Sequence, residues 1–369
     1  MKFAVITHAL HYREDKRINA YAPYVNEMNL WGRYVDQFLI VAPKASKIEP
    51  AINMAYEQDQ IRWYTIPSFS ITSIVNALSA IILIPVVFIQ IFRACVVADH
   101  IHLRCPGNVG LLGCLVQIFF PGKPKTAKYA GNWGSNKKQP WSYRLQKSIL
   151  RSTVLTRNMK VLVYGEWPGQ TSNIKPFFTA TYLDKEKIPV IERNYNEELQ
   201  FIFAGTFSPG KQPLWAARFV HSLLQAGQKV KLHYYGDGIE RRSVEEFIRI
   251  EGLEDKIVLH GNQPKQIVKA ALQNAHFLLL PSKSEGWPKV VAEAMFWGCI
   301  PIVTPVSCVP WMLDYGKRGF LISESPAQQA NSFIEALKTL NLNEMAGSGV
   351  EWSRNYTLDR FEKEIQKLL

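Results

Sequence analysis

Two glutamates, Glu285 and Glu293, with seven residues between them, are the residues whose types and spacing point most directly to chemistry. The apolar run from His276 to Pro281 predicts a buried parallel strand before them, and Val290 to Trp297 predicts the helix that follows. Glu285 then lies in the loop at the carboxyl end of the strand, and Glu293 lies in the first two turns of the helix. Because the first N–H groups of a helix lack internal partners and attract anions, this segment can bind a phosphorylated sugar.

Each part of this segment has its own expected role. Glu285 can accept hydrogen bonds from the hydroxyls of a sugar, and Glu293 can accept them from a ribose. The backbone amides from Trp287 to Val290 can hold a diphosphate. A simpler explanation, a solvated loop carboxylate and a helix acid that only complements the macrodipole, fits this spacing equally well. A second site has to decide between them.

A second phosphate-binding pattern lies earlier in the chain. Gln200 to Ser208 predicts a short apolar strand that ends in a glycine turn, and Lys211 follows it before a helical pattern from Pro213 to Ala226. This order of strand, glycine loop, lysine and helix is typical of phosphate binding. The triphosphate-binding Gly-Lys-Ser/Thr ending and the dinucleotide-binding Gly-X-Gly-X-X-Gly are both missing. Taken alone, Lys211 is better explained as an exposed loop lysine.

The two sites together belong to a series of motifs that covers about a third of the chain, from Leu199 to Leu321. The motifs, in chain order, are Ala204-Gly205-Thr206, Lys211, Tyr235-Gly236-Asp237-Gly238, Leu259-His260-Gly261, Pro281-Ser282, Glu285-Gly286-Trp287-Pro288, Glu293-Ala294-Met295 and Gly298 to Val303. This segment resembles the C-terminal domain of the retaining family 4 glycosyltransferases. Their glycosyltransferase B fold is an α/β fold in which two Rossmann-like domains face each other across a cleft. The resemblance implies that Glu285 contacts the donor sugar, Glu293 the ribose and Lys211 the diphosphate, with the loop near Gly261 beside the base.

The chain departs from the family at one position of this expected donor site. The family usually has an arginine after the glycine of the first loop, and Thr206 stands there. A missing cation weakens stabilisation of the departing diphosphate, and Lys289 is the candidate that compensates for it. Glu285 and Lys211 are the expected catalytic residues. The expected donor-binding residues are Gly205, Thr206, Lys211, Gly236, Gly238, Gly261, Glu285, Gly286, Trp287, Pro288, Lys289, Val290 and Glu293.

The length and patterning predict two α/β domains. A chain of 369 residues with 47% apolar residues can bury two cores of ordinary size. Predicted strands alternate with helices in both halves, which is typical of parallel doubly wound sheets. Among the predicted helices is one from Lys16 to Trp31. We expect an N-terminal acceptor domain over residues 1–190, a donor domain over 191–345, and C-terminal helices over 346–369 that pack back on the first domain.

The sequence indicates neither a metal nor any other cofactor. The five cysteines form no Cys-X-X-Cys pair and are odd in number, so reduced buried thiols are expected. An Asp-X-Asp motif is also missing, so no metal is assigned.

Polar and aromatic residues at the predicted strand ends of the N-terminal half suit a sugar acceptor. An aromatic face can cover the apolar side of a pyranose while polar groups bond its hydroxyls. The family often has a catalytic histidine at one of these ends, and Asn132-Trp133 stands near that place, so the residue with this role is left open. For His8 and for His11, each taken alone, a structural role is a better explanation than a catalytic one. The expected acceptor-side residues are His8, His11, Arg104, Asn132 and Trp133.

The charge distribution predicts an anionic partner. The formal net charge is +12, and the stretch from Arg104 to Lys160 holds eleven basic residues and no acid. Such a stretch suits a membrane surface, an acidic acceptor or nucleic acid, and no nucleic-acid-binding module accompanies it. We therefore expect no nucleic-acid partner. A solvated surface without a partner is the simpler alternative.

A neighbouring uncharged segment, Ile71 to Phe92, favours the membrane surface. It is long enough to span a bilayer, but spanning would separate the first three predicted strands from the rest of their sheet. These strands are Lys2–Thr7, Phe38–Ala42 and Ile61–Ile66. A helix that packs on the sheet and touches the membrane interface avoids this contradiction. The expected location is the cytoplasm, peripheral on the inner face of the cell membrane.

The expected function is that of a retaining glycosyltransferase. It would move a hexose or related sugar from a nucleotide sugar to a glycan or lipid-linked acceptor in cell-surface polysaccharide or glycoconjugate synthesis. One alternative is a sugar-nucleotide 2-epimerase of the same fold. The other, from a different class, is a non-catalytic protein that binds glycans or membrane surfaces.

Overall fold

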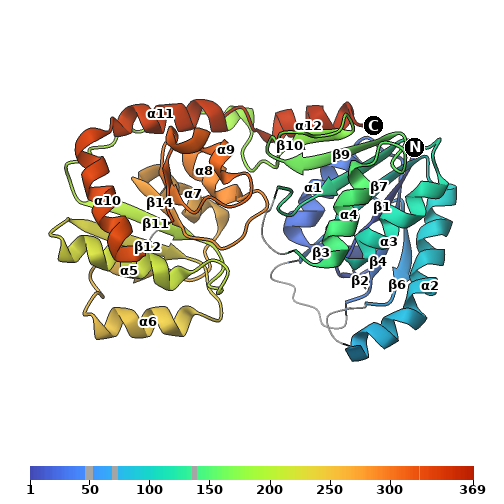
Figure 1. The fold of residues 1–369 in the computed structure, drawn as a ribbon, viewed down its shortest axis with the longest axis horizontal. Helices are drawn as coiled ribbons and strands as arrows, with labels where there is room; N and C mark the ends of the chain where they lie inside the picture. The colour runs from blue at the N-terminus through green and yellow to red at the C-terminus, as the bar shows by residue number, and fades with distance from the viewer. Residues whose placement is uncertain (46–52, 69–73, 135–138, 324) are drawn as a thin grey trace. The chain divides into compact units, whose positions relative to one another are not determined.

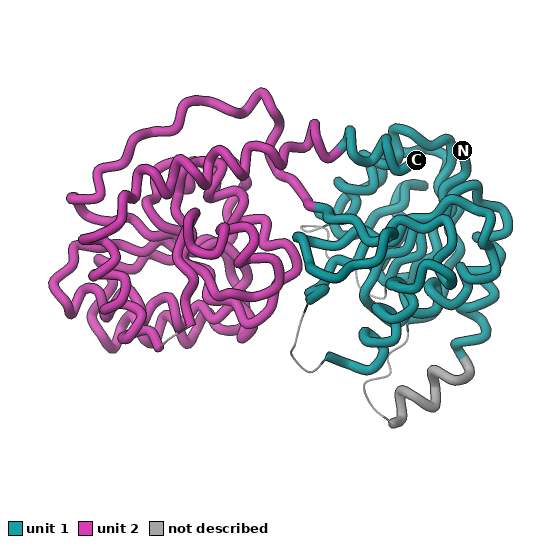
Figure 2. The backbone as a smooth tube through the Cα atoms, turned by 45° about the horizontal axis from the view of Figure 1, so that its top comes forward, with its two compact units in different colours: residues 1–177, 362–369 teal, residues 178–361 magenta. Residues whose placement is uncertain are grey.

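The computed structural model describes residues 1–45, 53–68, 74–134, 139–323 and 325–369, and its chain forms two compact units (Figure 1). Unit 1 consists of Met1–Phe177 and Glu362–Leu369, and unit 2 of Phe178–Phe361 (Figure 2). The chain therefore passes from one unit to the other twice. Each unit has its own parallel sheet and its own apolar core. The predicted α/β fold with two Rossmann-like domains is confirmed.

Unit 1 is built on a parallel sheet in which, over the described residues, seven strands follow the order β10-β9-β8-β7-β1-β4-β6. The central strands are buried on both faces, as their continuous apolar residues predict. In register, Val5 of β1 lies between Ile40 of β4 and His102 of β7. The strands are β1 (Lys2–Ile6), β4 (Gln37–Pro43), β6 (Ile61–Ile66), β7 (His100–Cys105), β8 (Lys125–Tyr129), β9 (Met159–Tyr164) and β10 (Ile174–Phe177).

Helices pack on both the sheet and one another in unit 1. In α2, the side chains of Val87, Ile91, Ala94 and Cys95 are buried in the core at helical spacing. The helices are α1 (Ala22–Gly32), α2 (Ile74–Val97), α3 (Asn108–Val116), the short 3₁₀ helix η2 (Gln117–Phe119) and α4 (Trp141–Arg151), with the end of α12 (Leu358–Gln366).

One predicted helix is partly wrong. Residues Arg17–Tyr21, expected to begin the helix that runs to Trp31, form strand β3 and pair antiparallel with β2 (His11–Glu14) and β5 (Asn53–Ala55). Asp15 and Lys16 have positive φ values of 45° and 67°, which close the β2–β3 hairpin and exclude a helix there. Helix α1 therefore starts only at Ala22.

Unit 2 is built on a second parallel sheet, in which the order of the six strands in the described part of the unit is β13-β12-β11-β14-β15-β16. The sequence predicts strands in this half near Gln200, Lys231, Ile257, Phe277, Pro301 and Phe320, and all six are confirmed. They are β11 (Leu199–Ala204), β12 (Val230–Tyr235), β13 (Ile257–Leu259), β14 (Phe277–Leu280), β15 (Ile300–Val303) and β16 (Phe320–Leu321). The helices are η3 (Asp184–Glu186), α5 (Pro213–Gln225), α6 (Arg241–Ile250), α7 (Lys265–Asn274), α8 (Lys289–Phe296), α9 (Val309–Met312), η4 (Asp314–Gly316), α10 (Pro326–Thr339) and α11 (Leu342–Ser353), with the start of α12.

The first crossing segment, Phe178 to Asn196, belongs to unit 2. Within it, the buried guanidinium of Arg193 donates hydrogen bonds to the carbonyl oxygens of Ala275 and Gln273 at 2.7 and 2.9 Å, and to that of Trp297 at 2.8 Å. These carbonyls lie at the carboxyl ends of α7 and α8, where helices leave acceptors unpaired. Arg193 therefore fixes the segment against the two helices that flank β14.

Candidate functional site

Glycine loops meet at the carboxyl edge of the unit 2 sheet. The Gly205 amide, after β11, donates to the carbonyl of Tyr235 at 2.9 Å, and the Gly236 amide, after β12, donates to that of Gly261 at 2.8 Å. A Cβ at Gly236 would lie 2.0 Å from the Gly205 carbonyl oxygen, and its φ is +139°. Only glycine fits there, so the backbones of the three loops come into direct contact.

The next glycine closes the same edge. A Cβ on Gly238 would lie 2.5 Å from the carbonyl oxygen of Phe207, whose amide donates to the carbonyl of Asp237 at 2.9 Å. Ligands of parallel α/β sheets bind beyond the carboxyl ends of the strands, and a backbone without side chains lets a phosphate come close. The structure thus brings together four of the predicted site residues, namely Gly205, Gly236, Gly238 and Gly261.

The loop after β14 joins this edge through side chains. Strands β11 and β14 are neighbours, and the Lys283 amide donates to the Gly210 carbonyl at 2.8 Å. Lys211 Nζ and Glu285 Oε1 lie 2.5 Å apart, with side-chain exposures of 28% and 10%. The two expected catalytic residues therefore form an ion pair. A diphosphate that recruits Lys211 has to compete with Glu285 for it.

The start of α8 corrects the expected set of backbone donors. The helix begins at Lys289, one residue earlier than predicted, and its N-cap is Pro288. Proline has no N–H group, so Pro288 cannot donate to a phosphate as expected. The amides of Lys289 and Val290 occupy the first turn, where a helix offers no internal acceptor. They are the donors that α8 can present to an anion.

Trp287 supports this loop with its side chain. The residue is only 7% exposed, and its ring packs against those of Trp352 and Tyr356, with ring centroids 6.1 and 5.5 Å away. The indole is thus part of the core of unit 2, and only the backbone of Trp287 is left for the expected donor contact. The side chain of Thr206 is exposed beside Gly205, and the backbone oxygen of Gly286 accepts a bond from Cys308 Sγ at 3.2 Å.

Glu293 has a partner that the sequence did not suggest. It is half-buried in the second turn of α8, and its Oε1 accepts a hydrogen bond from Thr181 Oγ1 at 2.5 Å. Thr181 lies 112 residues earlier, in the first crossing segment. No local pattern marks it, because a single threonine in an irregular segment carries no sequence signal.

Two of the residues expected on the acceptor side of unit 1 are buried instead. His11 is 0% exposed, with Nδ1 at 2.8 Å from the Ala9 carbonyl and Nε2 at 2.7 Å from the Tyr56 hydroxyl. Burial lowers the pKa of His11 to about 4. Trp133 is 1% exposed, and its Nε1 donates to Gln170 at 2.8 Å. Both are structural residues, so neither can contact an acceptor sugar.

The other three occupy strand ends of unit 1 differently. His8 is exposed after β1, and partial desolvation of its imidazole, followed by the charge of Arg104, lowers its pKa. Arg104 pairs with Glu27 of α1, and Asn132 is half-buried, with its backbone oxygen accepting from Gln139 at 3.1 Å. Among the predicted acceptor residues, His8 is the one whose side chain is open to solvent.

Several basic side chains between Arg104 and Lys160 are buried or paired, although the sequence predicts a basic surface without compensating acids. Arg104 and Lys128 share the carboxylate of Glu27, and the latter ion pair is 2.7 Å long. Lys125 and Lys147 are buried and donate to backbone carbonyls. Half-buried Lys123 donates to three carbonyls at the end of α2. Lys137 and Lys138 lie outside the described residues. Sequence counting overestimates the exposed charge because it cannot see burial.

The uncharged segment has an exposed apolar face, which we call the α2 patch. It consists of Val86, Ile89, Phe92 and Val96 of α2 with Phe119 of η2, with exposures between 37% and 64%. The rings of Phe92 and Phe119 lie 6.3 Å apart. Residues 71–73 of the segment lie outside the described ones. Within the described part of the chain, no helix has both the length and the apolar character needed to cross a membrane.

Among the described residues, no three His, Cys, Asp or Glu side chains lie close enough together to bind a metal ion. The cysteines Cys95, Cys105, Cys114, Cys299 and Cys308 are buried thiols.

The fold and this edge define a parallel α/β protein of the kind whose ligands bind beyond the carboxyl ends of the strands. Residues 184–350 match the family model of the glycosyl transferases group 1. It is 31% identical over 145 residues to the lipopolysaccharide 1,6-galactosyltransferase of Escherichia coli (strain K12), covering 39% of each chain. It is 23% identical over 235 residues to the GDP-mannose:cellobiosyl-diphosphopolyprenol alpha-mannosyltransferase of Xanthomonas campestris, covering 58% of each. The matches span 25% to 58% of the curated relatives' lengths.

Solved structures share the fold over the whole chain. The lipopolysaccharide outer core galactosyltransferase WaaB in its apo form superposes with a TM-score of 0.68 at 16% identity, covering 100% of this chain and 99% of that one. Anabaena Alr3699/HepE, solved in complex with UDP and glucose, gives a TM-score of 0.66 at 14% identity, covering 100% and 98%. The chain therefore has the fold of these two proteins.

Proposed function

We propose that this protein is a retaining glycosyltransferase that uses a nucleoside-diphosphate sugar and acts in cell-surface polysaccharide or glycoconjugate synthesis. The observation that carries the proposal is the meeting of Lys211, Glu285 and the α8 amino terminus at the glycine-lined edge of unit 2. These groups offer a cation and free amides for a diphosphate and a carboxylate for sugar hydroxyls. The curated relatives named above, whose names describe sugar transfer, support it.

The chemistry follows from where charge develops. Transfer breaks the bond between the sugar C1 and the diphosphate oxygen, and the electron pair leaves with the diphosphate. A bond forms between C1 and an acceptor hydroxyl oxygen, which releases its proton. Negative charge grows on the departing diphosphate, where Lys211 and the amides of Lys289 and Val290 stabilise it. Glu285 holds the hydroxyls of the sugar, and Glu293 holds the ribose. Retention of the anomeric configuration is what the Glu285–Glu293 motif implies by resemblance.

The test is transfer itself. The protein is incubated with UDP-, GDP- and ADP-hexoses, octyl glycosides and a bacterial lipid extract, and the new linkage is assigned by NMR. We expect one donor to be used and the product to keep the donor's anomeric configuration. An inverted product would contradict retention. Conversion of the nucleotide sugar without an acceptor would instead identify the epimerase alternative.

We further propose that the protein acts on the inner face of the cell membrane, and that unit 1 attaches peripherally through the α2 patch. An exposed apolar helix face with neighbouring cations suits an anionic lipid surface, since each cation near such a surface contributes about 1 kcal/mol. Arg93 is exposed on α2 beside the patch, and Lys123 lies at the helix end. A glycan or lipid-linked acceptor would be met at that surface.

Vesicle flotation tests this attachment. The wild-type protein should float with vesicles that contain phosphatidylglycerol at low salt, stay down with phosphatidylcholine alone, and lose binding as salt screens the cations. The double variant Ile89→Ser/Phe92→Ser should bind several-fold less. Ile239→Ser, which changes an 82% exposed residue of unit 2, is the control and should bind as the wild type does. Unchanged flotation of the double variant would rule out the patch.

A further inference from the structure

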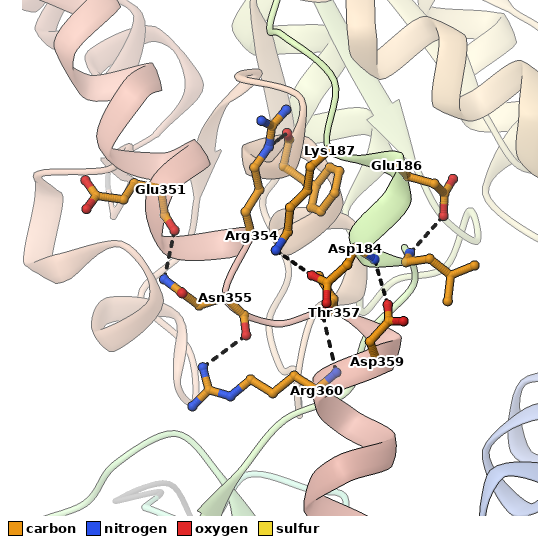
Figure 3. Close-up of polar contacts among 11 residues, drawn as sticks. Asp184, Glu186, Lys187, Glu351, Arg354, Asn355, Thr357, Asp359 and Arg360 are labelled. Carbon is orange, nitrogen blue, oxygen red and sulfur yellow. Dashed lines mark hydrogen bonds and ion pairs between the residues drawn. The ribbon is translucent and has the colours of Figure 1, made fainter.

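The first crossing segment, Phe178 to Asn196, is held within unit 2 by hydrogen bonds and ion pairs. The Asp184 amide donates to Asp359 Oδ2 at 2.6 Å, and Lys187 Nζ pairs with the Asp184 carboxylate at 2.5 Å. Arg354 Nη2 donates to the carbonyl oxygen of Ile188 at 2.6 Å. Figure 3 shows the bond from the Asp184 amide to Asp359 and the ion pair of Lys187 with Asp184. The segment is therefore a fixed support and not a loose connection.

Thr181 lies in this segment, shortly before η3, and is itself held from two sides. Lys265 Nζ, at the start of α7, donates to the Thr181 carbonyl at 2.9 Å. The next residue, Tyr182, is 4% exposed, with its ring 4.9 Å from that of Phe296 at the end of α8. Threonine is β-branched, so a fixed backbone leaves its side chain few rotamers. The hydroxyl is thereby aimed at α8.

The bond from Thr181 to Glu293 decides which carboxylate oxygen is left for a ligand. Thr181 Oγ1 donates to Oε1 at 2.5 Å, so Oε1 already has one donor. Oε2 can then accept from a ribose hydroxyl. Without the threonine, the glutamate would keep several rotamers and would have to be ordered when the ligand binds.

We propose that Thr181 is a positioning residue for Glu293, and that this pair makes the site select nucleotides that carry ribose hydroxyls. The inference rests on the proposed function and adds a specificity determinant to it. Thr181 touches no reacting atom. Its effect passes through the Glu293 carboxylate and therefore concerns the sugar of the nucleotide, not the transferred sugar.

Isothermal titration tests the proposal with the full chain. The probes are the one among UDP, GDP and ADP that binds best and its 2′,3′-dideoxy counterpart. Wild type should prefer the ribose form about tenfold, because a bond to a charged group is lost with the hydroxyls. Thr181→Val, which keeps the shape and removes the donor, should reduce this preference roughly three- to tenfold. Thr181→Ser should restore it, and Thr339→Val on α10 is the matched control.

The possible outcomes distinguish failure of the Thr181 role from failure of the proposed function. An unchanged ribose preference in Thr181→Val would overturn the positioning role, and Thr181→Ala serves as the second variant if the valine variant does not fold. A wild type that binds a diphosphate equally with and without ribose hydroxyls would overturn the ribose role of Glu293. A wild type that binds none of the three diphosphates would overturn the proposed function and this inference with it.

Discussion

Replacing Glu285 with Gln should lower kcat on the order of 10²- to 10³-fold, as loss of one preorganised electrostatic contact does, while nucleoside diphosphate affinity changes only a few-fold. The carboxylate is 10% exposed and lies 2.5 Å from Lys211 at the edge where β14 ends. The amide keeps the shape of the side chain but removes the charge, so the sugar hydroxyls lose their strongest acceptor. Diphosphate release at saturating donor and acceptor measures kcat.

A matched control distinguishes this role from a general effect of breaking an ion pair. Glu198 also pairs with a lysine in unit 2, Lys256, at 2.9 Å, but at an exposed position away from the glycine loops. Glu198→Gln should keep wild-type turnover because exposed pairs contribute little. If Glu285→Gln turned over as fast as the Glu198 variant, the assignment of Glu285 to the transferred sugar would fail.

Replacing Glu27 with Ala should destabilise unit 1 by about 3 to 5 kcal/mol, the usual cost of leaving a buried charge without its partner. Arg104 of β7 and Lys128 of β8 lie opposite each other in register, and both donate to the Glu27 carboxylate. Lys128 is 1% exposed, so water cannot replace this partner. The unfolding free energy of unit 1 in urea, followed by hydrogen exchange in its strands, measures the loss.

The stabilisation of unit 1 by Glu27 should decrease as the pH falls. Burial by itself raises the pKa of Glu27, but Arg104 and Lys128 outweigh burial and hold that pKa well below its ordinary value of 4.5. The stabilisation is therefore fully present above pH 4.5 and is lost as the pH falls below it. The difference between wild type and Glu27→Ala should shrink in acid. Glu14→Gln, at an exposed position of β2, should show neither effect, and a loss under 1 kcal/mol for Glu27→Ala would contradict the buried triad.

The sequence predicts most strands because their signals are local. Strand β14 forms at Phe277–Leu280, within the predicted His276 to Pro281, because a continuous apolar run specifies it. Strand β3 was mistaken for helix because Arg17–Tyr21 is short, and its pairing with β2 depends on the turn at Asp15 and Lys16. Such tertiary pairing overrides local propensity.

The candidate site could be predicted only in part, for a similar reason. The sequence motif is enough to predict that glycines such as Gly236 form a backbone loop. The pairing of Lys211 with Glu285 cannot be predicted in this way, because it depends on β11 and β14 being neighbours in the sheet. The bond between Thr181 and Glu293 depends on a crossing segment without regular pattern. Burial also removes Lys125 and Lys147 from the surface that charge counting assigned to them.

Hydrogen exchange with and without nucleoside diphosphates tests the central claim most directly, because it locates the bound ligand along the chain. With one of UDP, GDP or ADP at saturation, we expect slower exchange in three loops of unit 2, those at Gly205–Lys211, Tyr235–Gly238 and Gly286–Glu293. The strand ends of unit 1 should exchange as in the free protein. Protection confined to unit 1, or no protection with any of the three diphosphates, would contradict a donor site at the carboxyl edge of the unit 2 sheet.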